Sequence, residues 1–330
     1  MQAAPASWRS SLRWRAESAG LLQAVRDRLT GRDLALIAAG LTFYAGLAVV
    51  PLLVEAFGLT TWLTSAARVR ELGARLADLL PAAIGAPAAV ERLVSAGVGL
   101  DLVGGLLALL PLSLYGEGLR RALLRFSPRR ESLTSWRGRL LALPLLLLTP
   151  VLLYPLLLAV QVMDDLARTG GTIATIGRIA VGFYSVLAAL TVPLMWGFRV
   201  VAGSRVGWPA LLIGAPFTAA CLSGFLQGFV LFLSLPLNLG APFGGLTVVG
   251  GVAALGLWLY LLHLVLICGW LLTQALDERL SGGQPPGCGR PGTPGATGMA
   301  GSGFGAGGGF GAAGAEGGGE GGGEGGGEGG

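Results

Sequence analysis

The sequence predicts an all-α, polytopic membrane protein with six transmembrane helices and short amphipathic helices at the membrane interface. Of its 330 residues, 53% are hydrophobic and only 12% are charged, and the mean hydropathy is +0.69. Because soluble domains carry about 25% charged residues, this chain has too little polar surface to fold in water. Its uncharged runs are also long enough to cross the roughly 30 Å hydrocarbon core of a bilayer as helices. These two observations exclude ordinary soluble enzymes such as dehydrogenases and hydrolases.

The uncharged runs define the predicted spans. Residues 34–54 carry no charge, and Glu55 ends this first run. No Asp, Glu, Lys or Arg occurs between Arg205 and Asp277. That interval is too long for one helix, and a group of Pro, Asn and Gly residues near its middle divides it into two. The six predicted spans are residues 34–54, 96–116, 140–162, 179–198, 206–235 and 247–276.

The segments outside the predicted spans differ in composition, as the following four show. Residues 1–33 are basic with apolar residues at helical spacing, which indicates either amphipathic helices on an anionic membrane surface or a partly ordered basic arm. The loop 55–96 holds two amphipathic stretches, expected to be short interfacial helices. Residues 163–178 are expected to form a charged loop. The Gly/Glu-rich residues 281–330 would bury little apolar surface, which predicts a disordered tail.

The arginine distribution predicts the orientation. All 23 basic residues are arginine. With six spans, 17 of them fall on the side of the two termini and six fall on the other side. Basic loops stay on the cytoplasmic side of membranes, so both termini are expected in the cytoplasm. The same arginines are expected to contact anionic lipids, and they do not by themselves indicate a nucleic-acid partner.

The sequence offers no metal site, cofactor site or catalytic cluster. The three cysteines, Cys221, Cys268 and Cys288, lack metal-ligand spacing, and one histidine cannot complete a zinc site. We therefore expect no enzymatic activity and no cofactor.

Polar residues at membrane depth are costly, so each is a candidate functional residue. Glu117 either gates or binds a cation, or it is a helix-end carboxylate paired with Arg120 or Arg121. His263 either relays protons or is a neutral imidazole hydrogen-bonded to a neighbouring helix. Glu55 and Asp101 are expected to be solvated near the outer interface.

Further candidates are amides and helix-breaking residues. Three amides either line a polar path or hold helices together: Gln161, Gln227 and Asn238. Four residues are expected to break or hinge helices: Pro51, Pro193, Gly244 and Gly245.

Two predicted spans share a pattern. Residues 43–52 read FYAGLAVVPL, and residues 183–194 read FYSVLAALTVPL. An inverted repeat of three helices each would place the chain among secondary transporters. The alternative is a chance match between apolar segments of similar composition.

Residues 32–54 and 239–276 resemble the YihY/BrkB family of bacterial inner-membrane proteins. The first segment contains ALIAAGLTFYAGLAVVPLL, and the second contains a Phe243-Gly244 loop followed by LWLY at residues 257–260 and then Gly269. The resemblance implies a six-helix protein of the bacterial inner membrane, without a settled activity. Phe243 stands where a tyrosine is common in the family.

Two functions remain for such a chain. The first is a transporter-like or permease-like protein for an unknown small molecule or ion, supported by the proline and glycine breaks and the repeat. The second is a non-transporting, envelope-associated structural or partner-binding protein. A ribonuclease is not expected, because scattered carboxylates and one histidine do not form a nuclease site.

Overall fold

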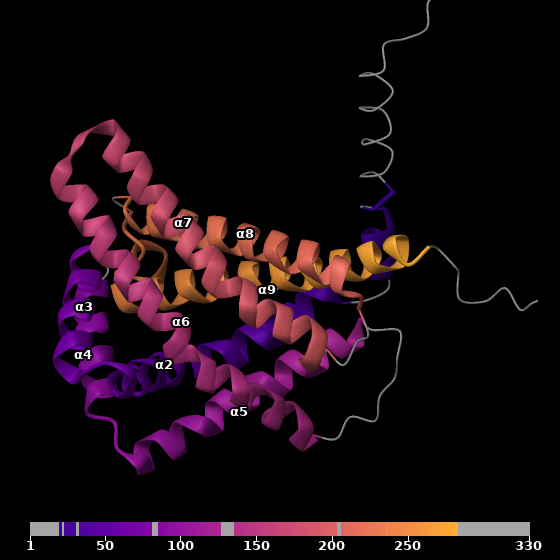
Figure 1. Ribbon diagram of the computed structural model, residues 1–330, viewed down its shortest axis with the longest axis horizontal. Coiled ribbons are helices and arrows are strands. Elements are labelled where there is room, and N and C mark those ends of the chain that lie inside the picture. Colours follow the sequence, from indigo (N-terminus) through magenta and orange to yellow (C-terminus); the bar gives the residue numbers. More distant parts are fainter. Residues whose placement is uncertain are drawn as a thin grey trace, which may run out of the picture. The chain divides into compact units, whose positions relative to one another are not determined.

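The computed structural model describes residues 20–21, 23–30, 33–80, 85–126, 135–202, 206–235 and 237–282 (Figure 1). Most of the predicted N-terminal segment and nearly all of the predicted tail lie outside these residues. Every regular element in the described part of the chain is a helix, which confirms the all-α class.

Six long helices carry the predicted spans. Five are long and apolar enough to cross a membrane. The sixth, α6, has 35 residues and contains the uncharged predicted span 140–162. The six helices are α2 (Leu34–Leu63), α5 (Leu102–Arg125), α6 (Ser135–Thr169), α7 (Gly171–Trp196), α8 (Trp208–Leu233) and α9 (Thr247–Leu280).

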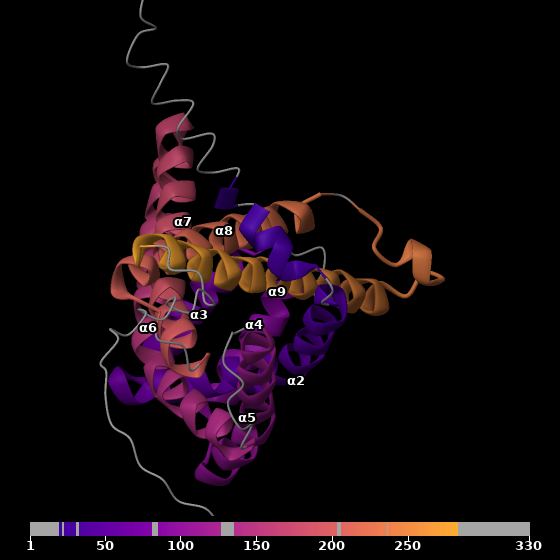
Figure 2. The same ribbon diagram turned by 90° about the vertical axis from the view of Figure 1, so that its right-hand side faces the viewer.

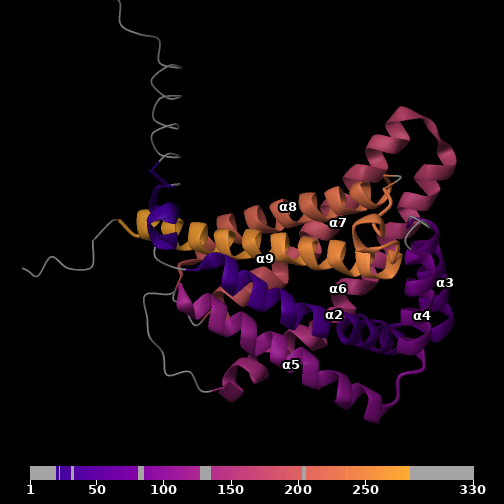
Figure 3. The same cartoon turned by 180° about the vertical axis from the view of Figure 1, so that it is seen from behind.

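The six helices form a closed ring. In the order α2, α5, α6, α7, α8 and α9, each helix contacts the next, α9 contacts α2 again, and α2 also contacts α6 across the ring. Figure 3 shows α8 beside α9 and α2 beside α5. The main core lies between α2, α5, α7, α8 and α9, and its largest buried side chain is Trp270. Consecutive helices run in opposite directions, so α2 begins and α9 ends at the same end of the ring. We call this the arginine-rich end, after Arg26, Arg28, Arg121, Arg125, Arg199 and Arg279.

The two predicted interfacial helices lie at the other end of the ring. Helix α3 (Ala66–Asp78) begins at Ser65, whose hydroxyl accepts a hydrogen bond from the Arg68 amide, and α4 (Ala86–Val98) follows it. Their apolar faces pack on α2 and α6 in a second core formed by Phe57, Val69, Leu72, Val94 and Leu157. The amphipathic pattern therefore marked helices that cover one end of the bundle.

The predicted boundary at Glu55 was wrong. Helix α2 continues to Leu63, and the Glu55 side chain is buried, with 5% of its surface exposed. The first turns of α5 cover it, because Gly105 has no side chain to hold them away. A carboxylate that looks like a span end in the sequence is thus covered by a neighbouring helix. Asp101 is exposed as expected and caps α5, since its Oδ1 accepts from the Gly104 amide at 2.8 Å.

The predicted loop 163–178 was also wrong. Helices α6 and α7 run through it and are separated by Gly170 alone. Asp164 and Arg168 pair at 2.8 Å one helical turn apart, which supports helix in a charged stretch. Gly170 and Gly171 have φ of 71° and 86°, a conformation that side chains disfavour, so the turn occurs there. Figure 1 shows the resulting hairpin at the upper left.

The described part of the N-terminal segment packs against the helix bundle. Residues 23–29 are helical, and Val25 and Leu29 pack against the main core. Arg28 donates to Gln274 Oε1 at 3.0 Å and forms an ion pair with Glu278. The amphipathic pattern was correct here, but its apolar face is covered by the arginine-rich end of the ring.

Helices α8 and α9 approach closely at two reciprocal contacts. Gly214 of α8 lies against Thr273 of α9, and Gly269 of α9 lies against Thr218 of α8. Each threonine hydroxyl donates to a carbonyl of its own helix, at 2.7 Å for Thr218 and 2.8 Å for Thr273. Small residues of this kind let membrane helices come into contact over a large area.

We expect Gly269→Val to destabilise the protein, because the added side chain would overlap Thr218. Overpacking of a tight contact costs roughly 1–3 kcal/mol. Thermal unfolding in detergent measures the loss. Gly256→Val on the same helix is the control, since a Cβ there meets nothing within 4 Å. Equal losses in both variants would contradict the close crossing.

Candidate functional site

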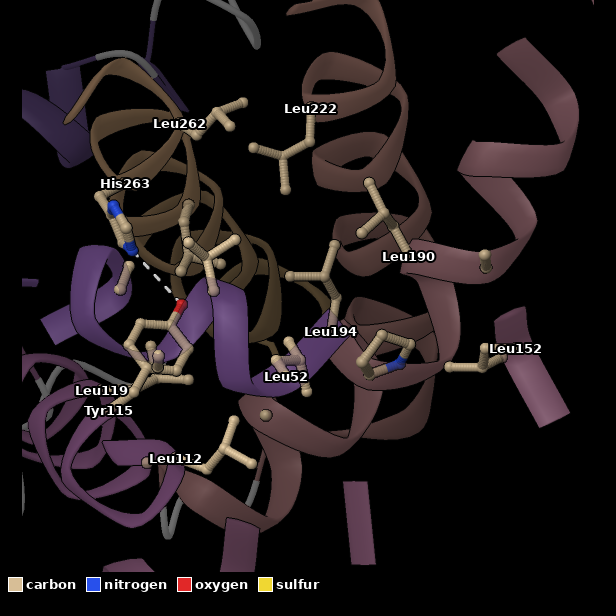
Figure 4. A pocket seen from close by; sticks show the side chains of 18 of the residues that line it. Leu52, Leu112, Tyr115, Leu119, Leu152, Leu190, Leu194, Leu222, Leu262 and His263 are labelled. Atoms are coloured by element: carbon tan, nitrogen blue, oxygen red, sulfur yellow. Dashed lines mark hydrogen bonds between the residues drawn. The ribbon is translucent and has the colours of Figure 1, made fainter. Parts of the chain in front are cut away.

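A cavity of about 670 Å³ lies inside the ring of helices. All six long helices contribute to its wall, together with the π-helical turn η2 (Gly197–Val201) that extends α7. Figure 4 shows leucines from α2, α5, α6, α7, α8 and α9 around this space. A cavity of roughly 300–1,000 Å³ is typical of small-molecule sites.

The wall is almost entirely apolar, and small residues leave the space open. Ala45 and Ala48 of α2 and Ala189 of α7 belong to a lining that consists mostly of leucine. Among the described residues of this lining, none is Asp, Glu or Arg, and three have polar side chains: Ser113, Tyr115 and His263.

His263 and Tyr115 form the polar edge of the cavity (Figure 4). The His263 Nδ1 lies 2.7 Å from the Leu259 carbonyl, which can only accept, so Nδ1 carries the proton. Nε2 of a neutral ring is then the acceptor, and the Tyr115 hydroxyl donates to it at 3.3 Å. Thr42 of α2 also contacts Nδ1, at 3.3 Å. These contacts match the alternative in which His263 is a neutral imidazole hydrogen-bonded to neighbouring helices. Through them His263 of α9 joins α2 and α5.

The wall contributed by α7 is irregular. Pro193 lines the cavity and lacks the amide that would bond the Ala189 carbonyl. One turn later the helix widens into η2, where the Ala202 amide donates to the Gly197 carbonyl at 2.9 Å. Such π-turns are frequent at functional sites because their backbone bonding can shift.

Glu117 does not line the cavity, although Gly116 and Leu119 beside it do. Its Oε1 accepts from Arg121 Nε at 2.7 Å, so one of the two expected helix pairs is present. The Glu117 side chain is 7% exposed, and among the described residues its Oε2 has no hydrogen-bond partner. The carboxylate therefore faces away from the cavity, at the arginine-rich end.

The three candidate amides lie apart from one another and from the cavity wall. Gln161 of α6 accepts from Arg68 of α3 at 3.1 Å. Gln227 of α8 donates to the Ile179 carbonyl of α7 at 3.3 Å. Both therefore join helices. Asn238 is exposed and accepts from the Gly240 amide at 3.2 Å, within the α8–α9 connection.

Two of the four candidate helix breaks lie within continuous helix, and the other two form a turn. Pro51 and Pro193 lie inside α2 and α7. Gly244 and Gly245 have φ of 65° and 87° and form the turn after the short helix η3 (Ala241–Phe243). Figure 2 shows this α8–α9 connection extending away at the right.

An ion-pair network at the α3–α4 end joins α3 to α6. Glu71 accepts from Arg68 at 2.8 Å and from Arg75 at 3.0 Å, and Arg75 reaches Asp164 of α6 at 3.7 Å. The hydrogen bond from Arg68 and then that from Arg75 lower the pKa of the Glu71 carboxyl from 4.5. The network lies outside the predicted spans, so it is accessible to water and salt.

Sequence reasoning missed Tyr115 and Thr42, the partners of His263. Both are single polar residues in apolar runs, and no spacing relates them to a histidine 148 or 221 positions away. The apolar wall could have been inferred only from knowing which faces of six helices point inward.

Comparison with known protein families identifies the family to which this chain belongs. The model of the family described as virulence factor BrkB matches residues 25–290. The chain belongs to the BrkB family. A search of curated proteins and a search of solved structures gave no match. The resemblance to this family in residues 32–54 and 239–276 is confirmed, and the BrkB match together with the apolar helices identifies an integral membrane protein.

We expect the contribution of Glu71 to stability to depend on pH. The pKa of the Glu71 carboxyl is lowered in the folded protein, so the ionised carboxylate stabilises the α3–α6 contact at any pH above its ordinary pKa of 4.5. This stabilisation is lost as the pH falls through the lowered pKa of the folded state. Glu71→Gln should lower the thermal midpoint slightly at neutral pH, and its difference from wild type should shrink as the pH falls below 4.5. Glu91→Gln on α4 is the control for loss of an exposed carboxylate, because Glu91 is exposed. A difference independent of pH would contradict this role.

We expect Tyr115→Phe to remove the hydrogen bond to His263 and lower stability by about 0.6 kcal/mol, the average for hydrogen bonds between membrane helices. Thermal unfolding in detergent or nanodiscs measures it. Tyr184→Phe is the matched control, because Tyr184 is 66% exposed on the outer surface of α7. If both variants unfold like wild type, the pair does not hold α5 to α9.

Proposed function

We propose that this BrkB-family protein is a transporter-like, permease-like protein that moves a small molecule through the centre of its helix ring. One feature carries the proposal: a cavity of about 670 Å³ to which every spanning helix contributes. Secondary transporters commonly place their substrate site between helices near the membrane midplane. We also propose that the protein is not an enzyme, which fits a cavity wall without carboxylates or arginines.

The α7 wall supports movement around this cavity. Pro193 and the π-turn η2 both face it, and the space narrows or widens if α7 bends at this point. Prolines and π-turns are recognised causes of helix bending. The wall therefore contains an element suited to two arrangements.

We propose that the protein lies in the inner membrane of a bacterium with both termini in the cytoplasm. The arginine distribution supports this orientation. The contact of Arg28 with Gln274 and Glu278 supports it too, because it brings both ends of the described chain to the arginine-rich end. Exposed arginines at that end, including Arg121, are available to anionic lipid headgroups.

The second candidate function is a non-transporting, partner-binding membrane protein. The α8–α9 connection favours it, since Leu237, Phe243 and Leu246 are exposed there. Exposed apolar patches mark contact surfaces in many proteins. Transport assays separate the two candidates.

We expect Ala189→Phe to lower transport roughly tenfold, corresponding to about 1.4 kcal/mol of added barrier, because the added phenyl group would obstruct the cavity. Purified protein in liposomes is tested with a panel: currents for ions and charged solutes, uptake of labelled amino acids and sugars, and transbilayer movement of a fluorescent phospholipid. Empty liposomes give the background.

Ala188→Phe is the matched control, because Ala188 is the neighbouring residue and points outward. A flux that Ala189→Phe reduces and Ala188→Phe retains supports transport through the cavity. A flux equally sensitive to both variants contradicts the cavity as its route. No flux in any arm of the panel contradicts transport and favours the partner-binding function.

A further inference from the structure

The described residues of the cavity lining offer no group that would recognise a polar or charged solute, and a membrane surrounds the spanning helices. We propose that the occupant of the cavity is a hydrocarbon chain, namely an acyl chain of a bilayer lipid. This inference rests on the proposed function, since it names the substrate class of the same cavity.

Every polar side chain of the lining already uses its hydrogen-bond donor within the protein. The Ser113 hydroxyl donates to the Leu110 carbonyl at 2.7 Å. The Tyr115 hydroxyl donates to His263 Nε2 at 3.3 Å. His263 Nδ1 donates to the Leu259 carbonyl at 2.7 Å. Among the described lining residues, every side-chain donor is thus occupied and none is left to bind a carboxylate, a phosphate or a sugar.

The part of the lining that the structure describes also lacks charged side chains of either sign. The nearest carboxylate along α5, Glu117, is bound to Arg121 and stands outside the wall. A cation entering the cavity would lose its hydration without gaining an anionic partner, and an anion would find no arginine. Sugars and amino acids would leave several hydrogen bonds unmade. These solutes are therefore excluded from the cavity in this arrangement of the helices.

A hydrocarbon chain meets none of these penalties. The wall is built mainly of leucine, which is as apolar as lipid tails. Transfer of a hydrocarbon chain from the bilayer to the cavity therefore changes its free energy little. Apolar cavities elsewhere stay dry and take apolar guests, even at roughly 150 Å³. This cavity is about 670 Å³. Acyl chains are the most concentrated apolar molecules around a spanning bundle, because they are its solvent.

Buried residues of the wall report occupancy from inside. Leu194 and Leu222 are each only 8% exposed, yet both line the cavity (Figure 4). Leu47 of α2 and Leu212 of α8 are 47% and 56% exposed on the outer surface. An acyl chain in the cavity touches the first pair, and an annular lipid touches the second.

The test reconstitutes the full chain in nanodiscs containing a phospholipid with a photoactivatable diazirine in its acyl chain. After illumination, mass spectrometry maps the adducts. We expect adducts on Leu194 and Leu222 as well as on Leu47 and Leu212. In Ala189→Phe the adducts on Leu194 and Leu222 should fall roughly tenfold, because the added phenyl group occupies space that the acyl chain would use. The adducts on Leu47 and Leu212 should stay unchanged.

Ala188→Phe is the control for the added phenyl group. If Ala189→Phe does not fold, the adduct map of the wild-type protein alone shows whether an acyl chain occupies the cavity. Adducts confined to the outer pair overturn the inference. Inner adducts from a photoactivatable fatty acid but none from the phospholipid overturn the assignment to a bilayer lipid. Inner adducts without flux in the transport panel support the acyl-chain inference and contradict transport. Flux without inner adducts supports transport and contradicts the acyl-chain inference.

Discussion

Every polar group at membrane depth must be satisfied within the protein, and most features of this structure follow from that constraint. It accounts for the exclusive use of helices in the described part of the spans. It also accounts for threonines that bond their own helix, as Thr218 and Thr273 do. The same constraint pairs His263 with Tyr115 and leaves the cavity wall without a side-chain donor to offer. Satisfaction of polar groups thus shapes both the fold and the candidate site.

Side-chain size decides where the ring is closed and where it is open. Glycines at Gly214 and Gly269 bring α8 and α9 into contact. Around the cavity, by contrast, small residues such as Ala48 and Ala189 belong to the wall and leave space there. Lipid tails provide no hydrophobic force to press helices together, so packing depends on this fit of small against large residues. A ring can therefore be tightly closed on one side and hollow in the middle.

Parts of this fold were predictable from the sequence, and the errors have a common cause. Six spans and two amphipathic helices follow from uncharged length and helical periodicity, which are local properties. Glu55 and residues 163–178 were misjudged because charge was taken to end a helix. Glu55 is covered by α5, and Asp164 pairs with Arg168 along α6. In both cases the surroundings of the charge, and not its position in the sequence, decided the structure.

The sequence by itself determined that this is an integral membrane protein built of apolar helices and where its arginines gather along the chain, because these depend on composition and length alone. Only the tertiary structure decided which helices are neighbours, that His263 meets Tyr115 and Thr42, and that Glu117 turns away from the cavity. The physical reason is that apolar helices in lipid have several faces of nearly equal hydrophobicity. Which face turns inward is set by the shapes of neighbouring side chains, and those are brought together only when the chain folds.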